Sequence, residues 1–268
     1  MTSFYRSEPY KPNQKAPFRL SRSKIELFMQ CQRCFWLDVR LKITRPSSPP
    51  FNINKAIDEL FKKEFDIYRS KGKPHPLMAE KGIKAVPFQH PHLDKWRRAL
   101  GNDAGIDTVH KTSNLHIYGA IDDVWVDDDG KLMVVDYKAT AKAEPVKSLG
   151  PKGNWQDMYR RQMEIYQWLF KQNGFKVNKT GYFVYATGSW ANDRFDNVVN
   201  FETHIFGHRG DDSWVEPTIL KMKQVMDSDT LPAVGKQVMD QTKPCEFCNY
   251  AKQRTEITLK ALKKLTNN

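Results

Sequence analysis

The segment 119–140, GAIDDVWVDDDGKLMVVDYKAT, constrains the fold of this chain more than any other. Apolar and β-branched residues fill a run on each side of Asp128-Asp129-Gly130, as they do in paired strands. A three-residue loop that ends in glycine suits a type I turn, because glycine enters the left-handed region at no steric cost. The pattern predicts a β-hairpin in which position 122 lies opposite position 136.

This hairpin would place two carboxylates and an amine on one patch. Asp136 and Lys138 are two residues apart, so they leave their strand on the same face, near Asp122. Two neighbouring carboxylates repel each other unless they share a proton or bind a divalent cation. Oxygen ligands for Mg²⁺ or Mn²⁺ beside a lysine are what phosphodiester hydrolysis requires. The alternative is a solvated acidic hairpin with one cross-strand salt bridge.

Four segments in the same order resemble a known family: SRSKIELFMQCQRCFWL (21–37), GAID (119–122), VDYK (135–138) and QMEIY (162–166). They are similar to motifs of the PD-(D/E)XK nuclease superfamily, in its RecB-like branch, which includes the CRISPR adaptation exonucleases and AddB-type nuclease domains. The resemblance spans residues 20–255. It implies an α/β, restriction-endonuclease-like core: a mixed β-sheet flanked by helices, with N- and C-terminal helices joined by a cysteine metal clasp.

The resemblance also implies roles for individual residues. Asp122 and Asp136 would bind Mg²⁺ or Mn²⁺ together with the backbone carbonyl of Tyr137, and Lys138 would be the catalytic lysine. Two further residues would lie near the active site and contact the nucleic acid or the activated water; they are Gln162 and Tyr166.

One position departs from the family pattern. Many relatives have a histidine ligand on an early helix, where this chain has Asp58. An aspartate still suits Mg²⁺ or Mn²⁺, but it removes a nitrogen ligand that favours transition metals. Glu59 and Glu64 compete for the same role, and an exposed helix carboxylate is the alternative for Asp58.

The four cysteines form two C-x-x-C pairs, Cys31/Cys34 and Cys245/Cys248, which is a metal-site signature. We expect no disulfides in a cytoplasmic protein, so a metal would join the two ends of the domain. The resemblance implies a [4Fe–4S] cluster, although the family's last cysteine would fall near Arg254 and Cys34 must replace it. We place the cluster first, Zn²⁺ second and four unliganded thiols third.

Charge and hydropathy agree with a nucleic-acid partner. The chain of 268 residues has 43 Lys and Arg against 31 Asp and Glu, a net charge of +12, and a basic surface attracts polyphosphates. Neither a membrane-spanning run of about eighteen apolar residues nor a secretory signal is found, so we expect a cytoplasmic protein that does not bind membranes. The partner would be DNA, single-stranded or at duplex ends.

The spacing of apolar residues and turn formers predicts one large domain, with residues 1–18 as a mobile basic arm and 19–268 as the nuclease-like domain. A capping box at Ser23 and Glu26 would open a helix over 23–40. Residues 71–93 read as irregular. Further helices are expected over 53–70, 94–100, 155–173, 212–228 and after Cys248, and strands over 105–126, 131–140, 181–187 and 196–206.

These observations favour a metal-dependent DNA nuclease. The resemblance implies a RecB-like exonuclease of DNA repair, recombination or defence, with a helicase or another protein of those pathways as its partner. The alternatives are a non-catalytic nucleic-acid-binding protein that uses the nuclease fold and a zinc-clasped interaction protein.

Overall fold

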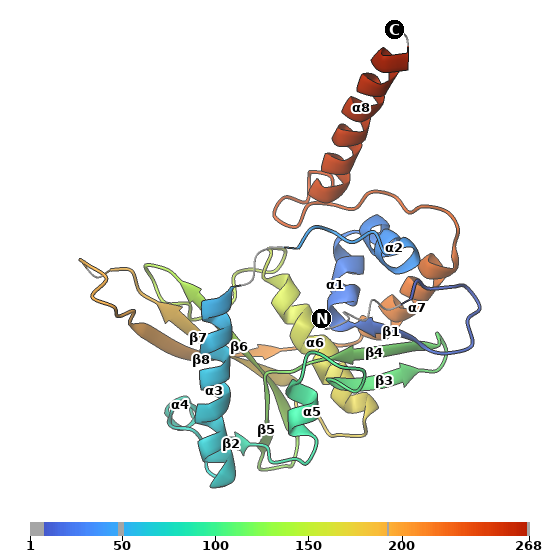
Figure 1. Cartoon of the computed structure of the whole chain (residues 1–268). Helices are drawn as coiled ribbons and strands as arrows, with labels where there is room; N and C mark the ends of the chain where they lie inside the picture. The colour runs from blue at the N-terminus through green and yellow to red at the C-terminus, as the bar shows by residue number, and fades with distance from the viewer. Residues whose placement is uncertain (1–7, 48–50, 192, 267–268) are drawn as a thin grey trace. The chain divides into compact units, whose positions relative to one another are not determined.

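The computed structural model describes residues 8–47, 51–191 and 193–266 (Figure 1). The chain divides into two compact units, and the single nuclease-like domain over 19–268 stays a prediction. The cysteine unit takes in the described residues of 1–48, 109–116 and 216–268, and the sheet unit those of 49–108 and 117–215. Each unit combines separate stretches of chain, so long-range contacts hold it together.

The sheet unit contains a five-stranded mixed sheet, in the order β2-β5-β6-β7-β8. Strands β6 and β7 are parallel, and the other neighbouring pairs are antiparallel. The predicted mixed α/β fold is confirmed. The strands are β2 (Ala85–Pro87), β5 (Asp123–Asp127), β6 (Leu132–Ala141), β7 (Thr180–Gly188) and β8 (Phe201–Arg209).

Two helices cover opposite faces of this sheet. Helix α3 (Asn52–Ser70) packs Phe61 and Phe65 onto the face that carries Val135 and Tyr137. Helix α6 (Asp157–Gln172) contacts the face that carries Asp136 and Lys138. Because successive strand residues point to opposite faces, the catalytic candidates of β6 lie under α6 and the apolar core lies under α3.

The hairpin of β5 and β6 has the predicted register. Asp123 pairs with Val135 and Val126 with Leu132, so the ladder extends to place position 122 opposite position 136. Gly130 closes the loop with φ +72°, and its N–H donates to the Asp127 carbonyl at 3.0 Å.

A substitution at this glycine tests the local cause of the register. A Cβ at Gly130 would meet nothing within 4 Å, so strain in the left-handed backbone is the cost. We expect Gly130→Ala to lower the free energy of unfolding by about 1–2 kcal/mol. Gly130→Asn should cost less, because asparagine tolerates this conformation better. Urea unfolding of both variants checks the order, and equal losses would contradict it.

The cysteine unit contains β1 (Phe18–Ser21), α1 (Arg22–Gln30), α2 (Gln32–Leu41), most of α7 (Val215–Asp227) and α8 (Glu246–Thr266). A three-stranded sheet has the order β1-β4-β3, with β3 (Ile106–His110) and β4 (Leu115–Gly119).

The helix predicted over 23–40 is two helices. Cys31 has extended backbone, with φ −158° and ψ 107°, and it separates α1 from α2. The predicted capping box is also wrong: Ser23 lies inside α1, which begins after Ser21, and the Ser23 hydroxyl is 2.7 Å from the Ser21 hydroxyl. Helix α1 therefore ends, and helix α2 begins, at Cys31, the first cysteine of the Cys31/Cys34 pair.

In the arm predicted over residues 1–18, Tyr10 and Phe18 are buried and most residues between them are exposed, while residues 1–7 lie outside the described chain. Tyr10 is 4% exposed, its N–H donates to the Val39 carbonyl at 2.8 Å, and its hydroxyl donates to Asp227 at 2.6 Å. The buried ring of Tyr10, whose hydroxyl is hydrogen-bonded, anchors this segment. The polar residues around Tyr10 in the sequence did not indicate this anchor.

Other helix and strand boundaries differ from the predicted ones, because strand pairing and packing determine where each element ends. The strands predicted over 105–126 are β3, β4 and β5, and the strand predicted over 196–206 begins later, as β8. The stretch 71–93, expected to be irregular, contains α4 (Pro76–Glu80), β2 and the start of α5 (Leu93–Arg97). In the part of the chain that the structure describes, no helix combines the length and apolarity needed to cross a membrane.

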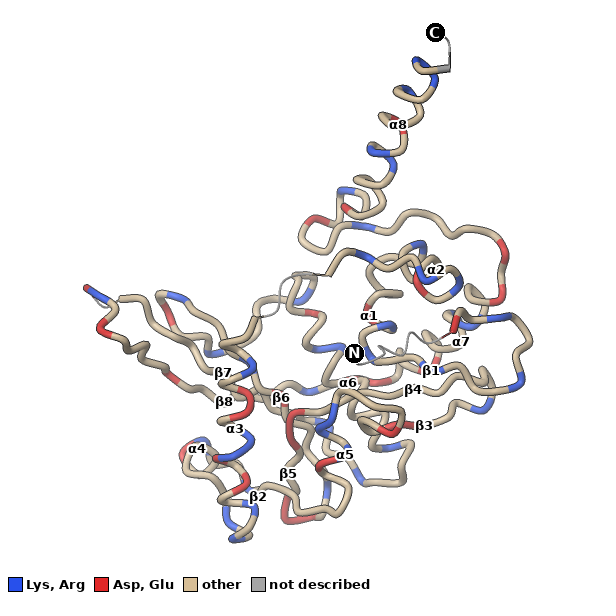
Figure 2. Tube along the Cα trace, viewed as in Figure 1, with Lys and Arg blue, Asp and Glu red and all other residues tan. Residues whose placement is uncertain are grey.

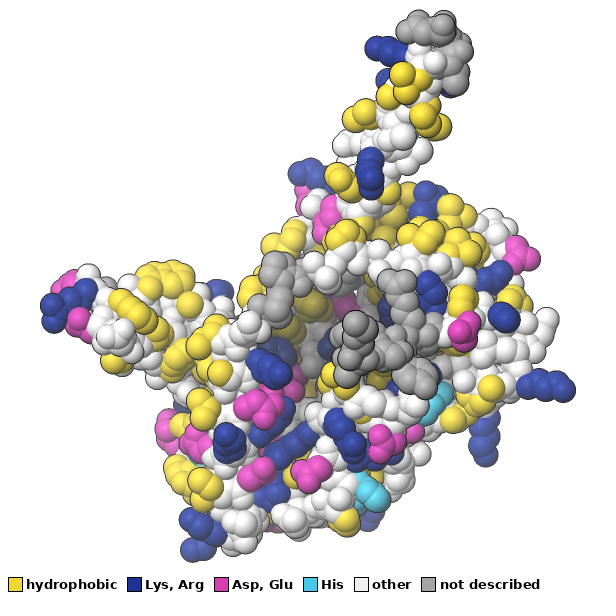
Figure 3. Space-filling model, in the orientation of Figure 1, with side chains coloured by type: hydrophobic (Ala, Val, Ile, Leu, Met, Phe, Trp, Pro, Cys, Tyr) yellow, Lys and Arg dark blue, Asp and Glu magenta, His cyan; other side chains and the backbone are white. Residues whose placement is uncertain are grey.

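Helix α8 carries much of the basic excess predicted at the C-terminus. Lys and Arg recur along it with few acidic positions, as Figure 2 shows. It also exposes apolar side chains, among them Tyr250, Ile257 and Leu265 (Figure 3).

Candidate functional site

Asp136 is at the centre of the candidate active site. Its side chain is buried on β6, and Gln162 of α6 donates to its Oδ1 at 2.7 Å. The Lys138 ammonium forms an ion pair with its Oδ2. Among the described residues, Lys138 is the partner of that oxygen, and no second donor reaches it. A buried carboxylate oxygen with spare lone pairs is available to a cation.

Asp122 faces the backbone of the same strand. It lies just before β5 and is half-buried, and its Oδ2 accepts the N–H of Tyr137 at 2.8 Å. This bond extends the hairpin ladder by one side chain and holds Asp122 beside Asp136 and Lys138. Burial and the charge of Asp136 raise the pKa of Asp122 to about 7.

Lys138 is held in place by charge and by an aromatic ring. Burial alone would lower its pKa, but the charges of Asp136 and Asp122 raise it, so the ammonium stays charged. Its Nζ lies 4.7 Å from the centroid of the Tyr159 ring. Sequence reasoning missed Tyr159 as a site residue, although it precedes Gln162 by three positions and therefore shares its helix face.

Asp58 of α3 is half-buried and accepts a hydrogen bond from Lys62 at 2.6 Å. Burial, followed by the charge of Asp122, raises the pKa of Asp58. The competing candidate Glu64 pairs with His75 at 2.8 Å, and the side chain of Glu59 is 54% exposed. Asp58 is therefore close enough to Asp122 for their charges to interact.

The carboxylate oxygens of Asp58, Asp122 and Asp136 nevertheless do not form one closely spaced group. Within the described ranges, the four cysteines form the one group of three or more metal-ligating side chains whose ligand atoms gather closely. Asp58 is paired with Lys62, and Asp136 with Lys138. The lysines thus offset the repulsion between the acids.

Tyr166 is close to the site but does not face it. It is buried, and its hydroxyl donates to the backbone carbonyl of Ala120, two residues before Asp122. This contact holds the chain that presents Asp122. The contact of Tyr166 with the nucleic acid or the activated water stays a prediction.

Behind the site lies a buried ionic network that sequence reasoning also missed. Asp123 is fully buried and accepts hydrogen bonds from Arg69 at 2.5 Å, from Arg97 at 3.0 Å and from the Tyr137 hydroxyl at 2.7 Å. The Nε–H of Arg97 donates to the Asp122 carbonyl at 3.1 Å. The network links the backbone on both sides of the hairpin. The sequence feature that could have indicated this network is Asp123, the second aspartate of GAIDD, because it begins an apolar strand.

Comparison with known proteins decides the family. The model of the PD-(D/E)XK nuclease superfamily matches residues 19–253. The chain belongs to the PD-(D/E)XK nuclease superfamily. No curated protein matches the chain. Among solved structures, the crystal structure of SSO0001 is similar at 16% identity over 82% of each chain, with a TM-score of 0.33. Members of this superfamily are generally hydrolytic nucleases that use divalent metals, and the nuclease fold implies a nucleic-acid substrate.

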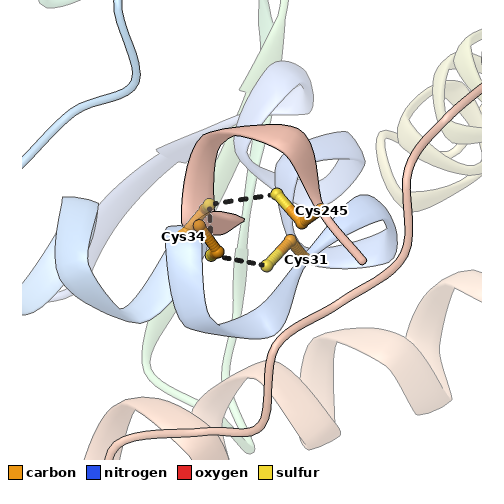
Figure 4. Close-up of side chains that lie close together, drawn as sticks. Cys31, Cys34 and Cys245 are labelled. Carbon is orange, nitrogen blue, oxygen red and sulfur yellow. Dashed lines mark hydrogen bonds between the residues drawn. The ribbon is translucent and has the colours of Figure 1, made fainter. Parts of the chain in front are cut away.

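The second candidate site of this PD-(D/E)XK protein is the cysteine site, made of Cys31, Cys34, Cys245 and Cys248. Figure 4 labels Cys31, Cys34 and Cys245. The predicted convergence of the N- and C-terminal pairs is confirmed: all four Sγ atoms lie within 4.8 Å of one another. Three of these side chains are buried and Cys248 is half-buried. A hydrogen bond from Cys34 lowers the pKa of the Cys31 thiol to about 4, and burial raises the pKa of Cys248 to about 12.

The surroundings of the cysteine site stabilise negative charge on sulfur. The N–H of Gly235 donates to the Cys31 sulfur at 3.2 Å, and Arg45 donates to the Cys245 sulfur at 3.4 Å. Arg45 also stacks on the Phe247 ring at 4.6 Å and donates to Gln30 at 2.8 Å. Four sulfur donors with such support can bind a metal ion.

Proposed function

We propose that this protein is a Mg²⁺- or Mn²⁺-dependent deoxyribonuclease that hydrolyses phosphodiester bonds. The observation that carries the proposal is the placement of Asp122 opposite Asp136 on one hairpin, with Lys138 paired to Asp136. These residues stand in the motif order of the superfamily to which the chain belongs.

The donor set fits a hard divalent cation. Asp122, the Oδ2 of Asp136 and the carbonyl of Tyr137 would all supply oxygen ligands. The N–H and C=O of one strand residue leave on the same side, and the N–H of Tyr137 points at Asp122. Asp58 would supply a further oxygen from α3. A bound divalent cation would act as a Lewis acid on the phosphate and lower the pKa of an attacking water.

The protein's own groups would orient this chemistry. Gln162 holds one oxygen of Asp136, so the other keeps its direction. The charged Lys138 would stabilise negative charge that builds on the phosphate, and the Tyr159 ring limits where its ammonium can move. Tyr166 and Arg97 fix the backbone of 120–122 from two sides.

The finer assignment is a RecB-like exonuclease that acts on DNA, single-stranded or at duplex ends, in repair, recombination or defence. The motif order supports it, and a helicase or another protein of those pathways would be its partner. The net charge of +12 and the basic helix α8 favour an extended polyanion as substrate.

A cleavage assay tests the function. The purified full chain is incubated with Mn²⁺ and end-labelled single-stranded, duplex and closed circular DNA, with and without a chelator. An exonuclease releases labelled nucleotides from linear DNA, spares the circle and stops with chelator. Binding of the same DNA without cleavage in Mn²⁺ or Mg²⁺ would establish the non-catalytic alternative.

Metal affinity should depend on pH in a defined direction. Since the pKa of Asp122 is raised to about 7, this carboxyl is mostly protonated at pH 6, and a cation must displace the proton. The affinity for Mn²⁺ should rise about tenfold per pH unit below pH 7 and level off above pH 8. Calorimetric titration in buffers of different ionisation enthalpy measures affinity and proton release together. A constant affinity from pH 6 to 8 would argue against Asp122 as a ligand.

A further inference from the structure

The spacing of the four sulfur atoms sets the size of what they can bind. Cys34 lies 3.7 Å from Cys245 and 3.5 Å from Cys248, and Cys31 lies 3.7 Å from Cys248, measured between Sγ atoms. A tetrahedral ion with Zn–S bonds of about 2.3 Å separates its sulfurs by about 3.8 Å. The short contacts join one C-x-x-C pair to the other, as the edges of such a tetrahedron do.

A [4Fe–4S] cluster does not fit this spacing. Each of its cysteines binds a different iron, so four irons and four inorganic sulfides must lie between the thiolates. In this chain all four sulfurs lie within 4.8 Å of one another, which leaves room for one ion. The order of preference drawn from the sequence, with the cluster before zinc, is therefore reversed by the geometry.

The backbone around the cysteine site is closely packed at Gly235. A Cβ on Gly235 would lie 2.5 Å from the Gln30 carbonyl oxygen and 2.6 Å from the Cα of Cys31, so only glycine lets its N–H reach the Cys31 sulfur. The Cys245 N–H donates to the Gly235 carbonyl at 2.8 Å, which ties the two cysteine-bearing segments together. Arg45 offsets part of the charge of four thiolates.

We propose that the cysteine site holds a single tetrahedral Zn²⁺ that clasps α1 and α2 to the start of α8. This assignment is independent of the nuclease activity, because it uses none of the carboxylates of the sheet unit. Zinc has no redox chemistry, so the clasp is structural.

Metal content of the unmodified protein tests the assignment directly. The full chain is purified in parallel under air and under nitrogen, and zinc, iron and acid-labile sulfide are measured. We expect one zinc per chain, negligible iron and sulfide, and a colourless protein in both preparations. A brown anaerobic protein with four irons and four sulfides per chain would overturn the proposal, as would one iron without sulfide or a metal-free protein.

Variants test which residues hold the ion. Cys34→Ser and Cys248→Ser should lose stoichiometric zinc. Should these variants fail to fold, the unmodified chain still gives the answer: thiol titration should release one zinc as four thiols react.

Arg45 provides a positioning test that leaves all four ligands in place. We expect Arg45→Gln to weaken zinc affinity about 10–100-fold, measured by competition with a chelator, and Arg45→Lys to restore part of it. Arg254→Gln, which removes the same charge from an exposed position of α8, is the control and should retain full affinity. Unchanged affinity in Arg45→Gln would overturn the role of Arg45.

Discussion

Asp136→Asn will lower the rate of DNA cleavage about a thousandfold while the protein stays folded. The amide has the shape of the carboxylate and can still accept the hydrogen bond from Gln162 at Oδ1. It lacks the charge that a divalent cation and Lys138 both require. Lys138→Met should have a comparable effect, because it removes the cation nearest the Oδ2 of Asp136. Initial rates with Mn²⁺ on single-stranded DNA measure both losses.

The same hairpin contains a matched control. Asp129 and Lys131 are also an aspartate and a lysine two residues apart and in contact at 2.8 Å, but they lie exposed in the loop. Asp129→Asn and Lys131→Met change the same charges without touching the site, so their cleavage rates should equal that of the unmodified protein. Full activity of Asp136→Asn, or equal losses in the loop variants, would remove the basis for the catalytic assignment.

Asp123→Asn will destabilise the protein by about 1–3 kcal/mol, because it removes the buried carboxylate that Arg69 and Arg97 share and leaves them only the partly exposed Asp66. Arg69 and Arg97 both donate to Asp123, and the side chains of Arg69 and Asp123 are 4% and 0% exposed. The loss of a buried partner costs more than the net value of the pair, since Asp66 offsets only part of the desolvation of the remaining charges. Urea unfolding followed by circular dichroism measures the change.

Asp103→Asn is the control for this second prediction. Asp103 pairs with Arg98 at 3.7 Å on the surface, where its side chain is 70% exposed, and water screens the pair. Its removal should leave the unfolding midpoint unchanged. A midpoint for Asp123→Asn equal to that of Asp103→Asn would show that the buried network does not stabilise the hairpin.

The predictable part of the active site is local in sequence. The register of β5 and β6 follows from three loop residues and one glycine, and with it the placement of Asp122 opposite Asp136. The alternation of a strand places Asp136 and Lys138 on one face. Gln162 joins them from α6, as the motif order implied.

The unpredicted part depends on contacts between distant segments. Asp123 looked like one acid among several in an acidic hairpin, and only the approach of Arg69 and Arg97 makes it the centre of a buried network. Tyr166 belongs to the expected motif, but the hydrogen bond from its hydroxyl to the Ala120 carbonyl was not predicted. Propensity and spacing carry no information about such partners.

The linear order of residues was sufficient to specify the nuclease motifs, the hairpin and the pairing of the cysteines into two C-x-x-C groups, because each depends on neighbours within one turn or one strand pair. It did not specify the division into two units or the extended break at Cys31 between α1 and α2. It also left the metal at the cysteines open. Four thiols suit a cluster or a single ion equally by composition, and the 3.5–3.7 Å spacing of their sulfurs, which only folding creates, favours the ion.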